Sequence, residues 1–422
     1  MRRILCATVV VLASQSLPAQ TCTGLCLQQQ SCPGGGSTTI SGTVYMPNGT
    51  VPLPNALVYV PNAPVAAFAP GVACDSCSPS GSPLVSAITG PNGSFAIANM
   101  PVGANIPLVI QIGRWRRQLV LPNVVGCINT AIATSVLRMP RTKAEGDIPL
   151  TAVVTGNADA EECLLRQIGV DDSEFTNPAG NGRIRFYTGS VPGGAGAVIN
   201  VNTPDETNLV ASQAAINKYD AVLMKCQGNT ANPSAAAKGY FTGFLNSGGR
   251  ALMFHYADGY LQGNPPLSSL VTWNPGAGGI ASDPQTGYID TGTTDGVKFA
   301  QWLQSVAGGT YGQLTLGQLR HDYDGVVAPA VNQVSLNQSG QIIPQQFSFN
   351  APVGIAMGSQ CGRVTFLDNH PVPTSGTAGM TFPAECAAGQ MTAQQLAAAY
   401  TLFNTANCLT GPYDRIFANG YD

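Results

Sequence analysis

The segment DAVLMKCQGNTANPSAAAKGYFTGFLNSGGRALMFHY, residues 220–256, contains two short apolar runs separated by a helical pattern. Each run has the length of a buried β-strand, and the helical pattern ends at a pair of glycines, 248–249. A strand, a helix and a second strand in this order are typical of a right-handed crossover between parallel strands. The segment therefore predicts an α/β domain with a mostly parallel sheet and flanking helices.

The same alternation of strand and helix continues along much of the chain. Strands are expected at 147–156, 183–189, 345–351 and 361–370, and helices at 157–170, 209–219, 295–307 and 392–408. Loops and turns are expected to dominate from Asp258 to Thr294. These patterns place the α/β domain at 147–408 and a C-terminal tail at 409–422, whose ending resembles the ends of some exported bacterial proteins.

A different pattern occupies residues 39–140, where short apolar runs are broken by turn dipeptides. Asn-Gly pairs at 48–49 and 92–93 lie between alternating segments, which is typical of tight hairpins. This region predicts a small β-sandwich. The chain is therefore expected to be multidomain, as its 422 residues also suggest.

The amino terminus has the features of a secretory signal peptide at 1–19. Arg2 and Arg3 precede an apolar stretch from Ile4 to Ala13 that is too short to span a bilayer. No later stretch approaches the roughly 20 apolar residues of a transmembrane helix. We expect a secreted, extracellular or periplasmic protein without a transmembrane segment, beginning with a Cys/Gly-rich leader at 20–38.

The cysteines and the composition agree with export. Removal of Cys6 with the signal peptide leaves eleven of twelve cysteines, so at least one is unpaired or bonded to another chain. The disulfide candidates are Cys22, Cys26, Cys32, Cys74, Cys77, Cys127, Cys163, Cys226, Cys361, Cys386 and Cys408. A formal charge of −3 argues against a nucleic-acid partner, because such partners require a broad basic surface.

Three motifs of the first domain, SGTVYMPNG, PLPNALVYV and SAITGPNGSFAIANMPVG, resemble the carboxypeptidase regulatory-like (prealbumin-like) module. That resemblance implies a carbohydrate-binding-like β-sandwich without catalytic activity of its own. The insert from Ala63 to Pro83 departs from the family pattern.

The motifs YDAVLMKCQG, GYFTGFLNSGGRALMFHYADGY and GRVTFLDNHP resemble the class I glutamine-amidotransferase-like (GATase-like) fold, particularly its ThuA-like members. The resemblance implies a flavodoxin-like sheet. It also implies a nucleophilic Cys at the strand-to-helix turn and an acid after the late His-Pro, but this chain has His255 and Val372 there. Cys226 ends a different strand, so glutamine amidotransferase activity is rejected. The two domains together resemble secreted bacterial proteins of unknown function.

Polar residues at strand ends are the candidate site, because ligands of open α/β sheets bind beyond the carboxyl ends of the strands. The candidate ligands of a divalent metal are His255, Asp258, Asp368 and His370, with His321 as an additional candidate, and the catalytic candidates are His255, His370 and Asp368. The alternative is that these residues only satisfy backbone groups and loop turns.

A basic patch in GRWRRQL, residues 113–119, is the candidate ligand-binding site. Arg114, Arg116 and Arg117 surround Trp115, and arginines beside an aromatic ring bind anionic polymers or sugars. In a strand, Arg114 and Arg116 share one face. The alternative is a solvated edge strand whose charges prevent aggregation.

Two functions remain open. The preferred hypothesis is a secreted or cell-envelope binding or structural protein with a catalytically degenerate α/β domain, whose partner is a polysaccharide or another envelope protein. The alternative is a metal-dependent hydrolase with His255 and His370 at its centre.

Overall fold

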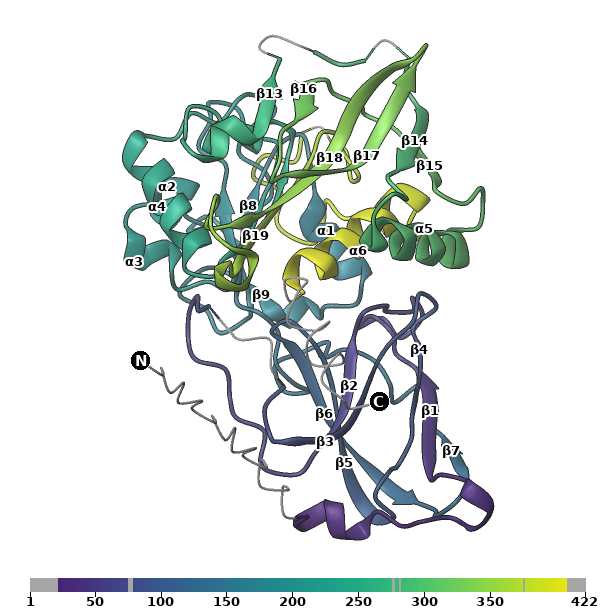
Figure 1. Ribbon diagram of the computed structural model, residues 1–422. Coiled ribbons are helices and arrows are strands. Elements are labelled where there is room, and N and C mark those ends of the chain that lie inside the picture. The colour runs from purple at the N-terminus through teal and green to yellow at the C-terminus, as the bar shows by residue number, and fades with distance from the viewer. Residues whose placement is uncertain (1–21, 75–78, 275–277, 281, 375, 408–422) are drawn as a thin grey trace, which may run out of the picture.

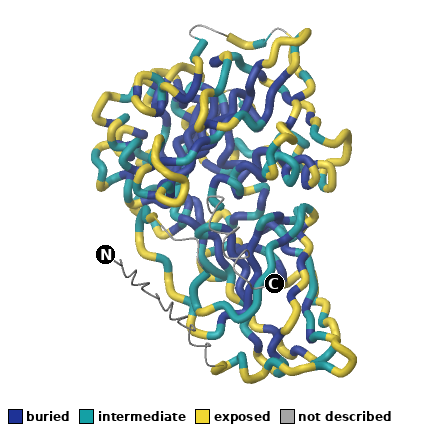
Figure 2. Tube along the Cα trace, viewed as in Figure 1, coloured by how far each residue is buried: buried dark blue, intermediate teal, exposed yellow. Residues whose placement is uncertain are grey.

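The two sequence patterns fold as two lobes in the computed structural model (Figure 1). The structure describes residues 22–74, 79–274, 278–280, 282–374 and 376–407. The expected signal peptide and the C-terminal tail lie outside the described residues. Buried residues run through the centre of each lobe, as Figure 2 shows.

The first lobe contains two sheets that share an apolar core. The three-stranded sheet has the order β4-β1-β7, and the four-stranded sheet has the order β3-β2-β5-β6. Their bounds are β1 Thr39–Thr43, β2 Leu57–Pro61, β3 Pro83–Ile88, β4 Ser94–Ile97, β5 Gly103–Ile112, β6 Trp115–Val124 and β7 Asn129–Ala131. Ile40 of the first sheet and Val58 of the second are fully buried in one apolar cluster. The resemblance to a carboxypeptidase regulatory-like module stays a prediction.

The two Asn-Gly pairs form turns, as expected, but only one closes a hairpin. Gly49 has a φ of +74° in a turn that closes a bridge between Tyr45 and Pro52. Gly93 also has a φ of +74°, yet the strands on either side of it, β3 and β4, belong to different sheets. The hairpin predicted at 92–93 is therefore wrong: this turn carries the chain from one sheet to the other.

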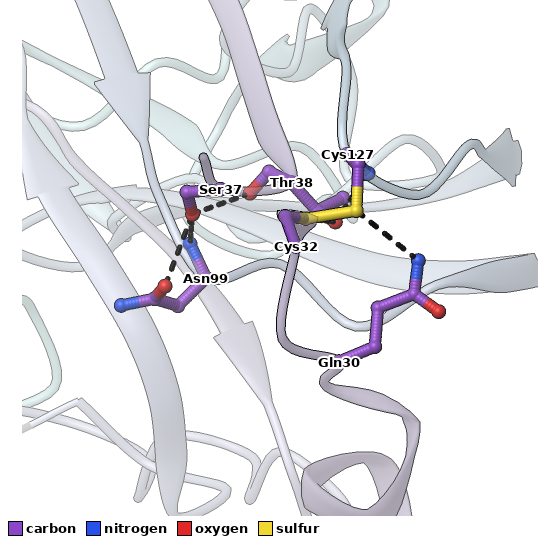
Figure 3. Close-up of a disulfide and its surroundings, with 6 residues drawn as sticks. All are labelled: Gln30, Cys32, Ser37, Thr38, Asn99 and Cys127. Carbon is purple, nitrogen blue, oxygen red and sulfur yellow. Dashed lines mark hydrogen bonds between the residues drawn. A yellow bond between two sulfur atoms is a disulfide. The ribbon is translucent and has the colours of Figure 1, made fainter. Parts of the chain in front are cut away.

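The leader is held against the first lobe by a disulfide between Cys32 and Cys127, which Figure 3 shows with its surroundings. Ser37 accepts a hydrogen bond from the backbone N–H of Asn99 at 2.8 Å, and the Gln30 amide lies 3.7 Å from the Cys127 sulfur. The leader is thus part of the folded first lobe rather than a free linker.

The second lobe is built on a ten-stranded sheet with the order β15-β14-β17-β18-β19-β12-β11-β8-β10-β9. The strands from β19 to β9 are parallel, and those from β15 to β18 pair in antiparallel fashion. The strand bounds are β8 Thr151–Thr155, β9 Phe175–Thr176, β10 Ile184–Thr188, β11 Ala221–Met224, β12 Arg250–Phe254, β14 Gln285–Ile289, β15 Gln313–Leu316, β17 Val331–Gln338, β18 Gln341–Ala351 and β19 Gly362–Leu367. A small second sheet pairs β13 (Val271–Trp273) with β16 (Tyr323–Val326).

Helices cover both faces of the parallel half, and the sequence alternation along its strands explains why. Val222 of β11 packs in one cluster with Phe241 of α4, whereas the next residue, Leu223, belongs to the other cluster, with Leu164 of α1. Helix α4 spans Ala235–Asn246, α1 Glu161–Gln167, α5 Thr294–Ala307 and α6 Ala393–Ala406. Strands buried on both faces read as continuous apolar runs, which is the pattern that predicted them.

The sequence missed two features of this lobe. The helix expected at 209–219 is two short helices, α2 (Glu206–Leu209) and α3 (Gln213–Ile216), because Ser212 caps the second by accepting from the N–H of Ala215. The antiparallel strands β14, β15 and β17 were also not expected. None of the described helices combines the length and apolar character needed to cross a membrane.

The first lobe packs against the amino ends of the parallel strands. Arg114, in the turn between β5 and β6, pairs with Asp220, which directly precedes β11, at 2.5 Å. A disulfide joins Cys74 of the first lobe to Cys361, directly before β19. The carboxyl ends of these strands therefore lie away from the first lobe.

Eight of the predicted disulfide cysteines are paired. The bonds join Cys22 to Cys26, Cys32 to Cys127, Cys74 to Cys361 and Cys163 to Cys386. Cys226 is a free, buried thiol, so its prediction as a disulfide cysteine is wrong. Cys77 and Cys408 lie outside the described residues.

Candidate functional site

Four neighbouring strands, β8, β11, β12 and β19, each end in polar residues at the carboxyl edge of the sheet. These residues are Asp159, Cys226, His255, Asp368 and His370, and each is at most 3% exposed. Parallel strands end at one edge, so residues far apart in sequence meet there. The structure thus brings together the predicted residues His255, Asp368 and His370.

His255 occupies the turn after β12 in an unusual backbone conformation. Its φ of +39° lies in the left-handed region, where a residue with a side chain is strained. The ring stacks on Tyr256 with centroids 3.7 Å apart, and its Nδ1 lies 3.2 Å from the sulfur of Cys226. The resemblance places a nucleophile at this turn, but here the turn aims an imidazole at a thiol.

Asp159 orients two of the site residues. One carboxylate oxygen lies 2.5 Å from Nδ1 of His370, and the other accepts from the backbone N–H of Cys226 at 3.2 Å. The network assigns the His370 proton to Nδ1, which leaves Nε2 with its lone pair. That Nε2 is buried and has no hydrogen-bond partner among the described residues.

The acidic side of the site lies beyond His255. Oδ2 of Asp322 is 3.3 Å from Nε2 of His255, and the backbone N–H of Asp322 donates to Oδ2 of Asp368 at 2.8 Å. Burial, and next the charge of Asp322, raise the pKa of Asp368 well above its usual value. The same two causes raise the pKa of Asp258 to about 7, although Asp258 is bonded to Gln262. Without a cation, burial therefore favours the protonated form of the Asp368 and Asp258 carboxyls.

The thiol and the imidazole are both held neutral. Burial, and next the charge of Asp159, raise the pKa of Cys226 to about 12, so the thiol is not an activated nucleophile. Burial lowers the pKa of His255, against the opposing effect of Asp322. These directions leave a neutral imidazole as a potential ligand.

Within this site, two sets of side chains are close enough to hold a metal ion. One donor atom each from Cys226, His255 and His370 lies within 4.8 Å of the others, and the same holds for His255, Asp322 and Asp368. His321 is outside both sets, because it pairs with Asp324 at 2.9 Å on a partly exposed segment. Asp258 belongs to neither set.

Asp159 and Asp322 are site residues that sequence reasoning missed. Asp159 lies four residues beyond β8, in the loop before α1. Asp322 directly precedes β16, a strand that no sequence pattern predicted. The only available signal for Asp322 was its place between His321 and Tyr323 in a short polar motif.

The predicted ligand patch lies at the contact between the lobes. Trp115 is 3% exposed and packs on Phe403 with centroids 5.4 Å apart, so it is not available to stack on a sugar. Arg116 is buried beside Asp147 at 2.9 Å, and Arg117 donates to two backbone carbonyls. The alternative of a solvated edge strand is also wrong for Arg116. Arg114 and Arg116 line an interlobe cavity of about 190 Å³. The binding of a ligand by these two arginines stays a prediction.

Known proteins offer only distant similarity. No family model matches the chain, and no curated protein matches it. ThuA-like proteins are among the similar solved structures. One from Bacteroides uniformis has a TM-score of 0.33 and 10% identity over 63% of this chain and 95% of its own. One from Parabacteroides merdae has a TM-score of 0.33 and 14% identity over 62% and 91%. A cytoplasmic protein from Salmonella typhimurium has a TM-score of 0.34 and 10% identity over 60% and 98%.

Proposed function

We propose that the α/β domain binds a divalent transition metal, zinc in preference, through Cys226, His255 and His370. The observation that carries the proposal is the convergence of three buried donor groups on one point. Each imidazole also has a carboxylate at its other nitrogen, Asp159 for His370 and Asp322 for His255. Carboxylates behind ligating histidines fix the ring orientation and raise ligand basicity.

The spacing of the donors supports this assignment. Bonds of about 2.0 Å to nitrogen and 2.3 Å to sulfur place neighbouring ligands of a tetrahedral zinc about 3.5 Å apart. Nδ1 of His255 and the sulfur of Cys226 are 3.2 Å apart, so a small outward shift would admit the ion. A thiolate with two imidazoles suits zinc better than it suits magnesium or calcium.

Three protein ligands leave a fourth position for water, which is the arrangement of catalytic zinc sites. A metal-bound water of lowered pKa is a hydrolytic nucleophile, and burial strengthens the electrostatic effect of the ion. We therefore prefer metal-dependent hydrolysis to the hypothesis of a degenerate pocket. Export of the protein, and a polysaccharide or envelope-protein partner, remain part of the proposal; the four described disulfides are consistent with an oxidising compartment.

Cobalt titration of the metal-free protein tests the proposal. We expect the first equivalent of Co²⁺ to produce a sulfur-to-cobalt charge-transfer band in the near ultraviolet, and we expect Cys226→Ser to lose that band. His370→Ala should weaken binding, whereas the matched control His321→Ala, outside the site, should not. Hydrolysis of aryl esters and phosphates, with and without a chelator, tests the reaction class. Absence of bound metal, or equal loss of binding in the His321 control, would overturn the proposal.

A further inference from the structure

His255 faces a different set of donors through each of its ring nitrogens. Nδ1 points to Cys226 at 3.2 Å, and Nε2 lies 3.3 Å from Oδ2 of Asp322. We infer that a second divalent cation binds between Nε2 of His255 and the carboxylates of Asp322 and Asp368, so that one imidazole bridges two ions. The inference rests on the proposed function only in sharing His255.

Three buried atoms point to a missing ligand on this side. Oδ1 of Asp368 has no hydrogen-bond partner among the described residues, and Nε2 of His255 and Oδ2 of Asp322 have only each other, at 3.3 Å. His255 is 3%, Asp322 6% and Asp368 0% exposed, so bulk water does not satisfy these atoms. Leaving the buried carboxylate oxygen of Asp368 unpaired is costly, and a cation held by all three atoms would remove that cost.

The charges point the same way. Asp322 and Asp368 lie side by side, and among the described residues no lysine or arginine is within ion-pair distance of either carboxylate. Asp258 adds a third buried carboxyl nearby. Buried charges are normally paired or coordinate metals, so this group needs either protons or a cation.

The geometry admits an ion with mixed oxygen and nitrogen ligands. The distance of 3.3 Å between Nε2 of His255 and Oδ2 of Asp322 matches the separation of about 3.3 Å between neighbouring ligands of a tetrahedral metal with bonds near 2.0 Å. Carboxylate oxygens with one imidazole suit Mn²⁺ or Zn²⁺. The first ion, on the sulfur side, has a softer ligand set, so the two positions differ in metal preference.

Binding of the second ion must release a proton. In the singly loaded site Nδ1 binds the first ion and Nε2 carries the imidazole proton toward Asp322. The second cation takes the Nε2 lone pair, and that proton leaves to solvent. A bridging imidazolate therefore predicts release of at least one proton for the second equivalent, and a further proton if the carboxyl pair shares one.

The experiment is a metal titration of the full protein, with elemental analysis after removal of free ions. We expect two equivalents of Zn²⁺ in the native protein and one in Asp368→Asn, which should retain the cobalt–sulfur band. Asp324→Asn, an exposed aspartate outside the site, is the matched control and should bind two. Calorimetry of the second equivalent in buffers of different ionisation enthalpy measures the released proton.

The two proposals fail in different ways. A single equivalent with the sulfur band, unchanged in Asp368→Asn, would overturn the second site alone. A single equivalent without the band, lost in Asp368→Asn, would overturn the Cys226 site and the bridging imidazole but retain the carboxylate site. Circular dichroism of each variant separates loss of a ligand from loss of the fold. Two equivalents without proton release would overturn the bridge.

Discussion

Replacement of Asp159 by Asn should weaken zinc binding although Asp159 is not a ligand. The carboxylate accepts from Nδ1 of His370 with one oxygen and from the N–H of Cys226 with the other. The amide of Asn has one acceptor and one donor, so it can serve only one of these two groups. If its NH₂ faces His370, the ring must accept at Nδ1, and its proton then moves to Nε2, the atom that should bind the metal.

The magnitude follows from the role of such supporting carboxylates. Loss of a carboxylate behind a ligating histidine typically lowers metal affinity about 10–100-fold, which corresponds to about 1.4–2.8 kcal/mol. The change is isosteric, so a change in the packing around the fully buried Asp159 should be small. We expect Asp159→Asn to keep the cobalt–sulfur band and to bind the metal with a larger dissociation constant.

A competition titration with a chromophoric zinc chelator measures the effect. Asp172→Asn is the matched control, because Asp172 is exposed, pairs with Arg166, and follows the carboxyl end of α1, whereas Asp159 precedes its amino end. An Asp159→Asn protein that binds zinc as tightly as the native protein would refute the reasoning. So would an equal loss in the Asp172→Asn control.

Three further predictions concern stability. Glu145→Gln should cost about 1 kcal/mol at pH 7, after allowance for solvent screening, because paired hydrogen bonds from Arg138 lower the pKa of Glu145 to about 2. A carboxylate with a lowered pKa stabilises the fold above pH 4.5, and this stabilisation is lost as the pH falls toward 2. Urea unfolding should therefore show no difference in stability between the native protein and Glu145→Gln near pH 2. A difference that stays constant with pH would contradict this assignment. Trp302→Phe should lower the free energy of unfolding in urea by about 2–3 kcal/mol, because the fully buried indole donates to the carbonyl of Pro52 at 2.8 Å across the two lobes. The control is Trp273→Phe, which breaks a hydrogen bond within one lobe. A loss under 0.5 kcal/mol in Trp302→Phe would refute the contact. The double change Cys74→Ser and Cys361→Ser should lower the free energy of unfolding by about 2–4 kcal/mol under oxidising conditions. Equal stability of the native protein with and without reductant would argue against an interlobe disulfide.

Much of the α/β lobe could be predicted because its strands are buried on both faces. The apolar runs of β8, β11, β12 and β19 give continuous signals, and their carboxyl ends necessarily share one edge of the sheet. This is why His255 and His370, 115 positions apart in the sequence, could be placed in one candidate site. The antiparallel strands β14, β15 and β17 carry polar residues on their exposed faces and gave no comparable signal.

Residues outside the strand ends could not be placed from sequence. Asp159 sits in a loop whose path depends on α1, and Asp322 reaches the site from a small separate sheet. Cys226 could be recognised as the end of a strand but not as the neighbour of His255. The sequence of one strand does not tell which strands lie beside it in the sheet. Arg116 looked solvated because the sequence does not tell which surface the other lobe covers.

X-ray absorption at the zinc edge, on protein loaded with one equivalent of Zn²⁺, tests the central claim most directly. The site of Cys226, His255 and His370 predicts one sulfur at about 2.3 Å, with nitrogen or oxygen neighbours at about 2.0–2.1 Å and the multiple-scattering pattern of two imidazoles. Cys226→Ser should remove the sulfur shell and leave the imidazole pattern. A first shell of oxygen and nitrogen alone in the native protein would contradict the proposed site.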